Sequence, residues 1–389
     1  MDWNQEIKLS DVLRRPKRKE RRPAGTTRPS SPKRKRSRKQ EVVGLKIGAS
    51  QIAASRVVNN GEAKLVQLAR VPLEPGVVVG GEVRDVPALA TALDAFFRQH
   101  KLPRRNIRLG LGTNRIGVRA LDIDGIDDER QLANVVRYRA HEALSIPLDQ
   151  AVLDFHVVSE TVDESGNVSR RVLLAAAYKD PIDHYVEACR AAKLELAGID
   201  VEAFALLRAL VPWRGELEVE PVAASVVLSI GHDRSTLAIS DGMVCDFMRV
   251  LDWGGAKLEA AIARELGFTP AEAGNLLFQL DLRANGSHGD DPRLARARAA
   301  ITRELQTLAR ELIASLQFYQ GEPGSLAISE VLVTGGTTNL PGLAEELERL
   351  TRVPFRMADP LGRVEVTNGL AEREDLASMA VAIGLGVER

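Results

Sequence analysis

Cysteine is scarce in this chain, with only Cys189 and Cys245 among 389 residues. Two cysteines so far apart do not build the dense disulfide framework of small secreted domains, and their apolar neighbours favour buried, inert thiols. Histidine is also rare: the six histidines form neither an HExxH pair nor a Cys/His cluster. The composition therefore indicates no structural disulfide and no metal site.

Long apolar runs are absent as well. No run approaches the roughly 18 residues of a membrane span, and no apolar segment follows the basic N-terminus as it does in a secretory signal. Neither the GxSxG turn of α/β-hydrolases nor the GxxxxGK[ST] loop of P-loop NTPases occurs. These absences predict a cytoplasmic protein that belongs to neither enzyme class.

An excess of one charge sign is also absent, since the formal net charge of the whole chain is zero. The charges are unevenly distributed, however, and the N-terminus is basic. Residues 1–41 hold 15 Lys/Arg against 5 Asp/Glu, and the stretch 14–41 is rich in Pro and Ser, a composition that predicts disorder. Such a tail suits an anionic membrane surface, a nucleic acid or simple solubilisation. Nucleic acid is the least favoured, because 14–41 lacks aromatics for base stacking.

One pattern occurs twice, half a chain apart. Residues 42–58 read VVGLKIGASQIAASRVV and residues 224–240 read ASVVLSIGHDRSTLAIS. Each copy has an apolar run, Ile-Gly, a polar turn and a second apolar run, so Lys46 aligns with Ser229 and Gly48 with Gly231. A turn signal follows each copy, which predicts two strand–turn–strand–turn–strand units and a duplicated domain.

The glycine turns are the candidate functional elements. A glycine at a strand end lets the backbone approach an anion closely, and two such turns facing each other would hold a polyphosphate; ordinary hairpins are the alternative. A Gly pair before a helix in LDWGGAK and another after a strand in VLVTGGT extend the pattern. The residues predicted to bind nucleotide are Lys46, Gly48, Ala49, Ser50, Ser229, Gly231, His232, Asp233, Gly254, Gly255, Lys257, Gly335 and Gly336.

Helical periodicity alternates with these β-prone runs. Helices are predicted at 86–100, 127–144, 181–193, 200–211, 256–266, 293–319, 342–351 and 376–386. Strands alternating with helices, twice over, predict an α/β fold of two related lobes with a ligand in the crevice at the strand ends.

The motifs together resemble the phosphate 1, phosphate 2 and adenosine motifs of the actin-like ATPase superfamily. Longer segments are similar to the PilM family of type IV pilus assembly proteins, relatives of the division protein FtsA. They are VRYRAHEALSIPLDQAVLDFHVV at 136–158, the run at 170–210, LARELIASLQFYQ at 308–320 and VLVTGGTTNLPGLAEEL at 331–347.

The resemblance covers about 42–389 and implies an actin-like two-lobed fold of duplicated sheet-and-helix domains, with a small inserted FtsA-like subdomain. The implied division is a disordered basic tail at 1–41, a first lobe at 42–117 and 196–220, the inserted subdomain at 118–195, and a second lobe at 221–389.

The function that the resemblance implies is a cytoplasmic scaffold of the type IV pilus assembly platform, peripheral to the inner membrane. Its partner would be the short N-terminal peptide of a PilN-like membrane protein. Two alternatives share the fold: an active ATPase or sugar-kinase-like enzyme, and the cytoplasmic part of a type II secretion platform.

One departure from the family pattern concerns the nucleotide. Typical members carry Asp before Ile-Gly in both phosphate motifs, where the carboxylates hold hydrated Mg²⁺; this chain has Lys46 and Ser229. A lysine does not ligate Mg²⁺, but its ammonium can neutralise phosphate charge directly. The resemblance therefore implies that ATP is bound weakly and without need of Mg²⁺, or not at all, and that no residue is assigned to catalysis or metal binding.

Overall fold

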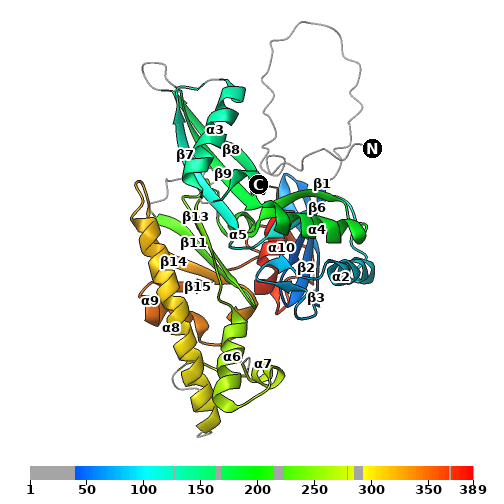
Figure 1. The fold of residues 1–389 in the computed structure, drawn as a ribbon. Coiled ribbons are helices and arrows are strands. Elements are labelled where there is room, and N and C mark those ends of the chain that lie inside the picture. Colours follow the sequence, from blue (N-terminus) through cyan, green and yellow to red (C-terminus); the bar gives the residue numbers. More distant parts are fainter. Residues whose placement is uncertain are drawn as a thin grey trace.

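The computed structural model of the chain describes residues 40–126, 128–144, 146–162, 168–213, 223–277, 279–283, 292–367 and 369–388 (Figure 1). The predicted disordered tail at 1–41 lies, apart from Gln40 and Glu41, outside these residues.

The first lobe is built on a six-stranded sheet. Its strands are β1 (Gln40–Ile47), β2 (Gln51–Asn60), β3 (Glu62–Pro72), β6 (Ile107–Leu111), β10 (Leu196–Val201) and β16 (Glu365–Val366). They run in the order β10-β6-β1-β2-β3-β16, with the three N-terminal strands as an antiparallel meander and β6 parallel to β1.

The second lobe repeats this arrangement in a five-stranded sheet. Its strands are β11 (Ala223–Ile230), β12 (Ser235–Ser240), β13 (Cys245–Leu251), β14 (Ala327–Thr334) and β15 (Phe355–Met357), in the order β13-β12-β11-β14-β15. The registers correspond too: Lys46 lies between Ala53 and Gly110, and Ser229 lies between Thr236 and Thr334. The predicted strand–turn–strand repeat is thus confirmed.

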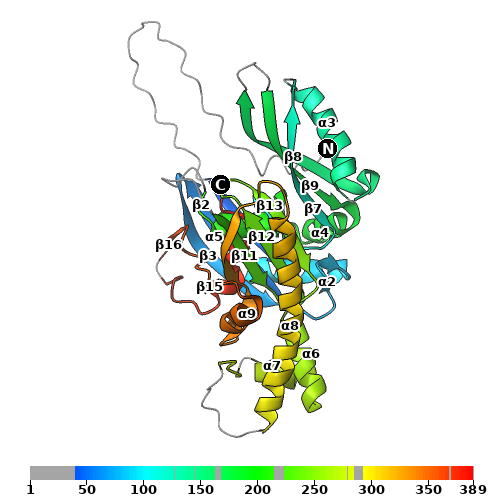
Figure 2. The same cartoon turned by 90° about the vertical axis from the view of Figure 1, so that its left-hand side faces the viewer.

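Helices cover the outer faces of both sheets and fill the space between them (Figures 1 and 2). On the first lobe these are α2 (Val86–Gln99) and α4 (Lys179–Ala191); on the second, α6 (Gly255–Leu266), α7 (Pro270–Leu277), α8 (Pro292–Gln320) and α9 (Leu343–Thr351). Two short helices, α5 (Glu202–Leu210) and α10 (Ala380–Gly386), pack between the sheets, where they bury apolar side chains from both.

The contact of α10 with its neighbours is very close because glycines line it. A Cβ added at Gly44 of β1 would lie 2.1 Å from the Ala382 carbonyl oxygen, and one at Gly384 would lie 1.8 Å from the Ala205 carbonyl oxygen. The buried Arg108 guanidinium donates to the carbonyls of Leu385 (3.0 Å) and Val387 (2.8 Å), which terminates the helix with a cation. Burial lowers the pKa of Arg108 to about 10.

One predicted helix begins later than expected. The pattern at 200–211 indicated a helix, but residues 196–201 form the edge strand β10 and only α5 follows. Residues 196–201, LAGIDV, are a short and mostly buried stretch beside the parallel strand β6, and a stretch this short has no periodicity that separates a strand from a helix.

A third sheet projects from the first lobe and packs against the second (Figure 1). It comprises β7 (Ile116–Asp124), β9 (Val168–Tyr178) and β8 (Ala151–Val162), with α3 (Glu129–Ala143) packed on one face. Its other face contacts α5 and the β12–β13 hairpin, where Arg171 pairs with Asp246 (2.8 Å) and Asp241 (3.8 Å). The division at 118–195 stays a prediction; within that range α4 packs against α2 of the first lobe.

Two expectations from composition are answered in the described residues. Cys189 and Cys245 are both buried and unpaired, and burial raises the pKa of Cys189 to about 12. No helix in this part of the chain is both long enough and apolar enough to span a bilayer.

Candidate functional site at the junction of the lobes

The predicted glycine motifs of the second lobe come together in space. The Gly231 carbonyl accepts hydrogen bonds from the Gly255 amide (3.0 Å) and the Thr337 hydroxyl (2.8 Å). The neighbouring His232 carbonyl accepts one from the Ala256 amide (2.7 Å), so the first turn of α6 is bonded to the 231–234 turn. Three segments that are far apart in the sequence thus form one structural unit.

Close approach of backbone explains several of these glycines without a ligand. A Cβ at Gly254 would lie 2.5 Å from the His232 carbonyl oxygen, and one at Gly335, whose φ is +103°, would lie 2.3 Å from the Ile230 carbonyl oxygen. A Cβ at Gly255 would lie 2.7 Å from the hydroxyl oxygen of Thr337. By contrast, Gly48 and Gly336 have no atom nearer than 3.4 Å and 3.8 Å to such a Cβ, respectively.

Many of the amides that were predicted to cradle phosphate already donate within the protein. Gly48 donates to Gln51 (2.9 Å), Gly231 to Arg234 (2.9 Å) and Gly335 to Ala377 (3.0 Å). An anion at these amides would have to replace existing hydrogen bonds, which reduces the net gain from binding it.

Lys46 has a partner that the sequence did not suggest. Its Nζ lies 3.7 Å from Oε2 of Glu202, the first residue of α5, and the two side chains are only 16% and 10% exposed. The Glu202 carboxylate rests against Gly112, where an added Cβ would lie 2.6 Å from Oε2. The ammonium at the first phosphate-like motif therefore already faces a buried carboxylate.

Glu202 and Gly112 left a weak signal in the sequence. The register places Gly110 of β6 opposite Lys46, just as it places Thr334 opposite Ser229, so Gly110-Leu-Gly112 corresponds to Thr334-Gly335-Gly336. Glu202 directly follows β10, so it is a charged residue at a strand exit.

The residues at the two phosphate-like motifs do not fit Mg²⁺. Ser229 is 5% exposed and uncharged, and Lys46 is cationic. Within the described ranges no three His, Cys, Asp or Glu side chains gather as metal ligands would. We therefore assign no metal to this junction.

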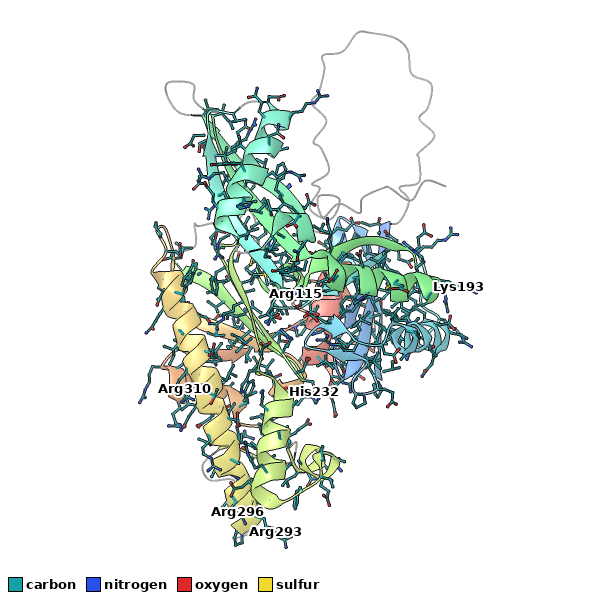
Figure 3. The ribbon with its side chains drawn as sticks, in the orientation of Figure 1. Arg115, Lys193, His232, Arg293, Arg296 and Arg310 are labelled. Atoms are coloured by element: carbon teal, nitrogen blue, oxygen red, sulfur yellow. The ribbon has the colours of Figure 1, made fainter. Side chains whose placement is uncertain are left out.

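The remaining predicted residues flank this unit. Ala49 and Ser50 form the turn between β1 and β2, and the Ser50 carbonyl accepts from the Leu73 amide (2.9 Å). His232 lies in the turn between β11 and β12, beside the N-terminal end of α6 (Figure 3), and its Nδ1 is 3.8 Å from Oε1 of Glu259. Burial raises the pKa of Glu259, and His232 partly offsets this. Lys257 is exposed in the first turn of α6.

Asp233 is directed across the junction. Its Oδ2 accepts from the Gly80 amide (2.8 Å), which belongs to the first lobe, in the turn between the short strands β4 (Val78–Val79) and β5 (Glu82–Val83). Asp233 was predicted to bind nucleotide, and in the structure it joins the two lobes.

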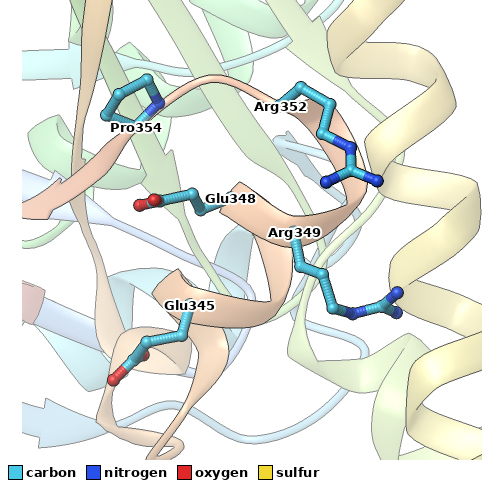
Figure 4. Close-up of a pocket in the computed structure, with 5 residues that line it drawn as sticks. All are labelled: Glu345, Glu348, Arg349, Arg352 and Pro354. Carbon is cyan, nitrogen blue, oxygen red and sulfur yellow. The ribbon is translucent and has the colours of Figure 1, made fainter.

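Two pockets lie elsewhere. A depression of about 410 Å³ on α9 is lined by Glu345, Glu348, Arg349, Arg352 and Pro354 (Figure 4). Another, of about 560 Å³, lies beside α3 and is lined by Asn134, Arg137, Tyr138, His141, Glu142 and Leu148. None of the residues predicted to bind nucleotide lines either of them.

Comparison with known proteins identifies the family. The sequence profile of the family described as type IV pilus assembly protein PilM matches residues 44–389. The chain belongs to this PilM family. The actin-like two-lobed fold that the motifs predicted is thereby confirmed, as is the predicted relationship to FtsA: the cell division protein FtsA of Pseudomonas aeruginosa is 24% identical over 348 residues, which are 82% of this chain and 83% of FtsA.

One solved structure agrees with this assignment, and a more distant one shares the fold alone. A chain of a PilM–PilN type IV pilus biogenesis complex superposes with a TM-score of 0.74 and 27% identity, over 90% of this chain and 98% of that chain. The ethanolamine utilization protein EutJ from Carboxydothermus hydrogenoformans shares the fold at a TM-score of 0.50 and 14% identity, over 90% of each chain.

Proposed function

We propose that this PilM family member is a scaffold of the type IV pilus assembly platform, located at the cytoplasmic face of the inner membrane, which docks the N-terminal peptide of a PilN-like protein. The likeness to a chain of the PilM–PilN complex carries the proposal, since it extends over 90% of the chain at 27% identity. A scaffold needs the two-lobed shape and a docking surface, and it does not need hydrolysis.

A synthetic peptide of the PilN-like N-terminus is expected to bind the full-length chain with a dissociation constant in the micromolar range, about −8 kcal/mol. Titration calorimetry measures this directly. Hydrogen exchange on the same complex should show protection within the three-stranded sheet β7–β9–β8, the subdomain that resembles PilN-binding relatives.

A peptide of scrambled sequence serves as the control for composition and charge. Lys64→Ala is the protein control, because Lys64 is a solvent-exposed side chain on β3 of the first sheet and does not lie in the three-stranded one. Absence of heat at high micromolar peptide, with the chain folded, would count against the pilus assignment.

For the nucleotide, we propose weak ATP binding that does not depend on Mg²⁺, with negligible turnover. Two observations support this. The carboxylates that would hold the metal are replaced by Lys46 and Ser229, and the glycine amides are engaged within the protein. An active ATPase of the same fold would need a metal-binding carboxylate at these turns.

The basic tail is expected to attach the protein electrostatically to anionic membranes. Residues 1–41 carry ten more basic than acidic side chains, and clusters of Lys and Arg bind anionic lipid surfaces with about 1 kcal/mol per residue. The full-length chain should sediment with vesicles containing anionic lipid at low salt and be released at high salt.

A chain lacking residues 1–41 provides the comparison. Equal sedimentation of the two chains would rule out the tail as the anchor, and much stronger competition by DNA than by free lipid would favour nucleic acid as its partner.

A further inference from the structure

Five residues from the two lobes meet at the junction, and we call them the interlobe clasp: Gly80 and Asn114 from the first lobe, and Asp233, Arg234 and Asp252 from the second. The Gly80 amide donates to Asp233 Oδ2 (2.8 Å), and the Asn114 side-chain amide donates to Asp252 Oδ2 (3.3 Å). The other Asp252 oxygen lies 2.9 Å from Arg234 Nη1. The carboxylates of Asp233 and Asp252, both from the second lobe, therefore have hydrogen-bond donors in the first lobe.

Gly80 is suited to this place for two separate reasons. Its φ is +65°, which residues other than glycine adopt at a cost, and an added Cβ would lie 2.7 Å from Arg234 Nη2. The Arg234 side chain, 16% exposed, packs against the turn at Gly80. A side chain at position 80 would therefore strain the backbone of the turn and displace the end of the Arg234 side chain.

The turn at Gly80 and Gly81 is also fixed by contacts within the first lobe. The buried Tyr185 hydroxyl donates to the Gly81 carbonyl (3.2 Å), and burial, with the carboxylates of Glu202 and Asp233 adding to it, raises the pKa of Tyr185. A Cβ at Gly81 would lie 2.4 Å from the Gly112 carbonyl oxygen, and Gly112 in turn contacts Glu202, the partner of Lys46. Close contacts therefore run from Lys46 to Asp233 without interruption.

These contacts use the side chains of the very turn that corresponds to a phosphate-binding motif. An anionic ligand beside Asp233 would be repelled by the carboxylate or would have to displace it from Gly80, because like charges disfavour each other at short range. The clasp therefore disfavours a phosphate at this turn, which fits the weak ATP binding proposed above.

We propose that the interlobe clasp, and not a bound nucleotide, fixes the closed orientation of the two lobes, in addition to the packing of α5 and α10 between the sheets. The 231–234 turn then acts as a lobe-closing contact, and the lobes keep their mutual orientation at any nucleotide concentration. Peptide docking can succeed or fail independently of this contact.

The distance between the lobes provides the test. Spin labels on cysteines introduced at Gln99, at the exposed end of α2, and at Gln306, on the exposed face of α8, report it in the full-length chain by pulsed electron paramagnetic resonance. The native Cys189 and Cys245 are buried and should remain unlabelled. Wild type is expected to give one narrow distribution that 5 mM EDTA with ATP, or Mg²⁺ with ATP, leaves unchanged.

Asp233→Ala should broaden this distribution toward longer distances, since loss of a hydrogen bond to a charged group lowers the closed-to-open ratio about ten- to hundredfold. Gly80→Ala keeps the amide donor but strains the positive φ of the turn and displaces the Arg234 side chain, and it should broaden the distribution in the same direction. Two matched controls should not. Asp359→Ala removes a carboxylate that accepts from the nearby Leu361 amide (2.9 Å), and Gly76→Ala strains another positive φ at a position where an added Cβ would meet no atom within 4 Å.

Asn114→Ala removes the other hydrogen bond of the clasp at an exposed position and should also broaden the distance distribution. It replaces Asp233→Ala or Gly80→Ala if either of these variants fails to fold. Two results would overturn the proposal: clasp variants indistinguishable from their controls, or a wild-type distribution that is broad alone and becomes narrow when ATP is added.

Discussion

Alanine at Gly384 is expected to destabilise the chain by at least about 3 kcal/mol, the upper end of what overpacking a core costs. The added Cβ would lie 1.8 Å from the Ala205 carbonyl oxygen and 2.5 Å from its carbon. Both atoms belong to the backbone of α5, so no side chain can rotate away. In addition, the Gly384 carbonyl accepts from Arg208 Nε (3.0 Å), and the partly buried Arg208 pairs with the buried Asp200.

The loss should appear as a lower unfolding temperature of the full-length chain, or as insoluble protein. Gly274→Ala is the control, because Gly274 also lies in a helix but has its nearest neighbour, the flexible Glu259 side chain, at 3.8 Å. That change should be neutral or stabilising by up to about 1 kcal/mol, the helix propensity gain from glycine to alanine. Equal unfolding temperatures for the two variants would contradict the close crossing of α5 and α10.

The second large effect is expected at the two phosphate-like motifs. Wild type should show a small ATP-dependent rise in unfolding temperature that is the same with Mg²⁺ and with EDTA, and no measurable turnover. Changing both Lys46→Asp and Ser229→Asp should make the rise depend on Mg²⁺, because the new carboxylates would supply ligands that the metal prefers.

The position of Glu202 determines whether Mg²⁺ stabilises or destabilises the double variant. In wild type its carboxylate faces the Lys46 ammonium at 3.7 Å. The change to Asp places two carboxylates side by side, which repel without a cation and are brought together by Mg²⁺. The double variant should therefore be less stable than wild type in EDTA and recover when Mg²⁺ and ATP are added, and the two single changes should not add, since both would act on one ligand.

Lys64→Asp controls for charge reversal alone, since Lys64 is exposed on β3 and pairs with Glu365 away from both motifs. A wild-type rise that EDTA abolishes would contradict the role of Lys46 as the cation. No rise in either condition would mean that ATP does not bind, and turnover would mean that other residues replace the missing carboxylates.

Patterns that are local in the sequence predicted much of the fold. The repeat around Gly48 and Gly231 became the β1–β2–β3 and β11–β12–β13 meanders with matching registers. The leucines spaced for one helix face gave α8, in which Leu305, Leu308, Leu312 and Leu316 are buried. Hairpins and amphipathic helices are determined by residues a few positions apart, so a single sequence carries their signal.

The candidate site was only partly predictable. The turns at Gly48, Gly231 and Gly335/Gly336 were expected to converge because all three are strand exits, and the structure brings the turns at Gly231 and Gly335 together. For Gly48 the convergence stays a prediction. What surrounds them was not expected: Glu202 beside Lys46, and Gly80 beside Asp233, which are separated by more than 150 residues in each pair. No local pattern marks which distant side chain completes such a pair.

Residue identity and short-range spacing fix the repeated strand units, the glycine turns and the presence of Lys46 and Ser229 before Ile-Gly, so all of these could be found without the structure. The contacts that those turns make follow from the tertiary structure. The packing of α5 and α10 between the sheets sets how closely the lobes approach, and that approach places Gly80 on Asp233 and Glu202 on Lys46. Long-range proximity of this kind arises from the sum of many buried contacts, and single motifs do not encode it.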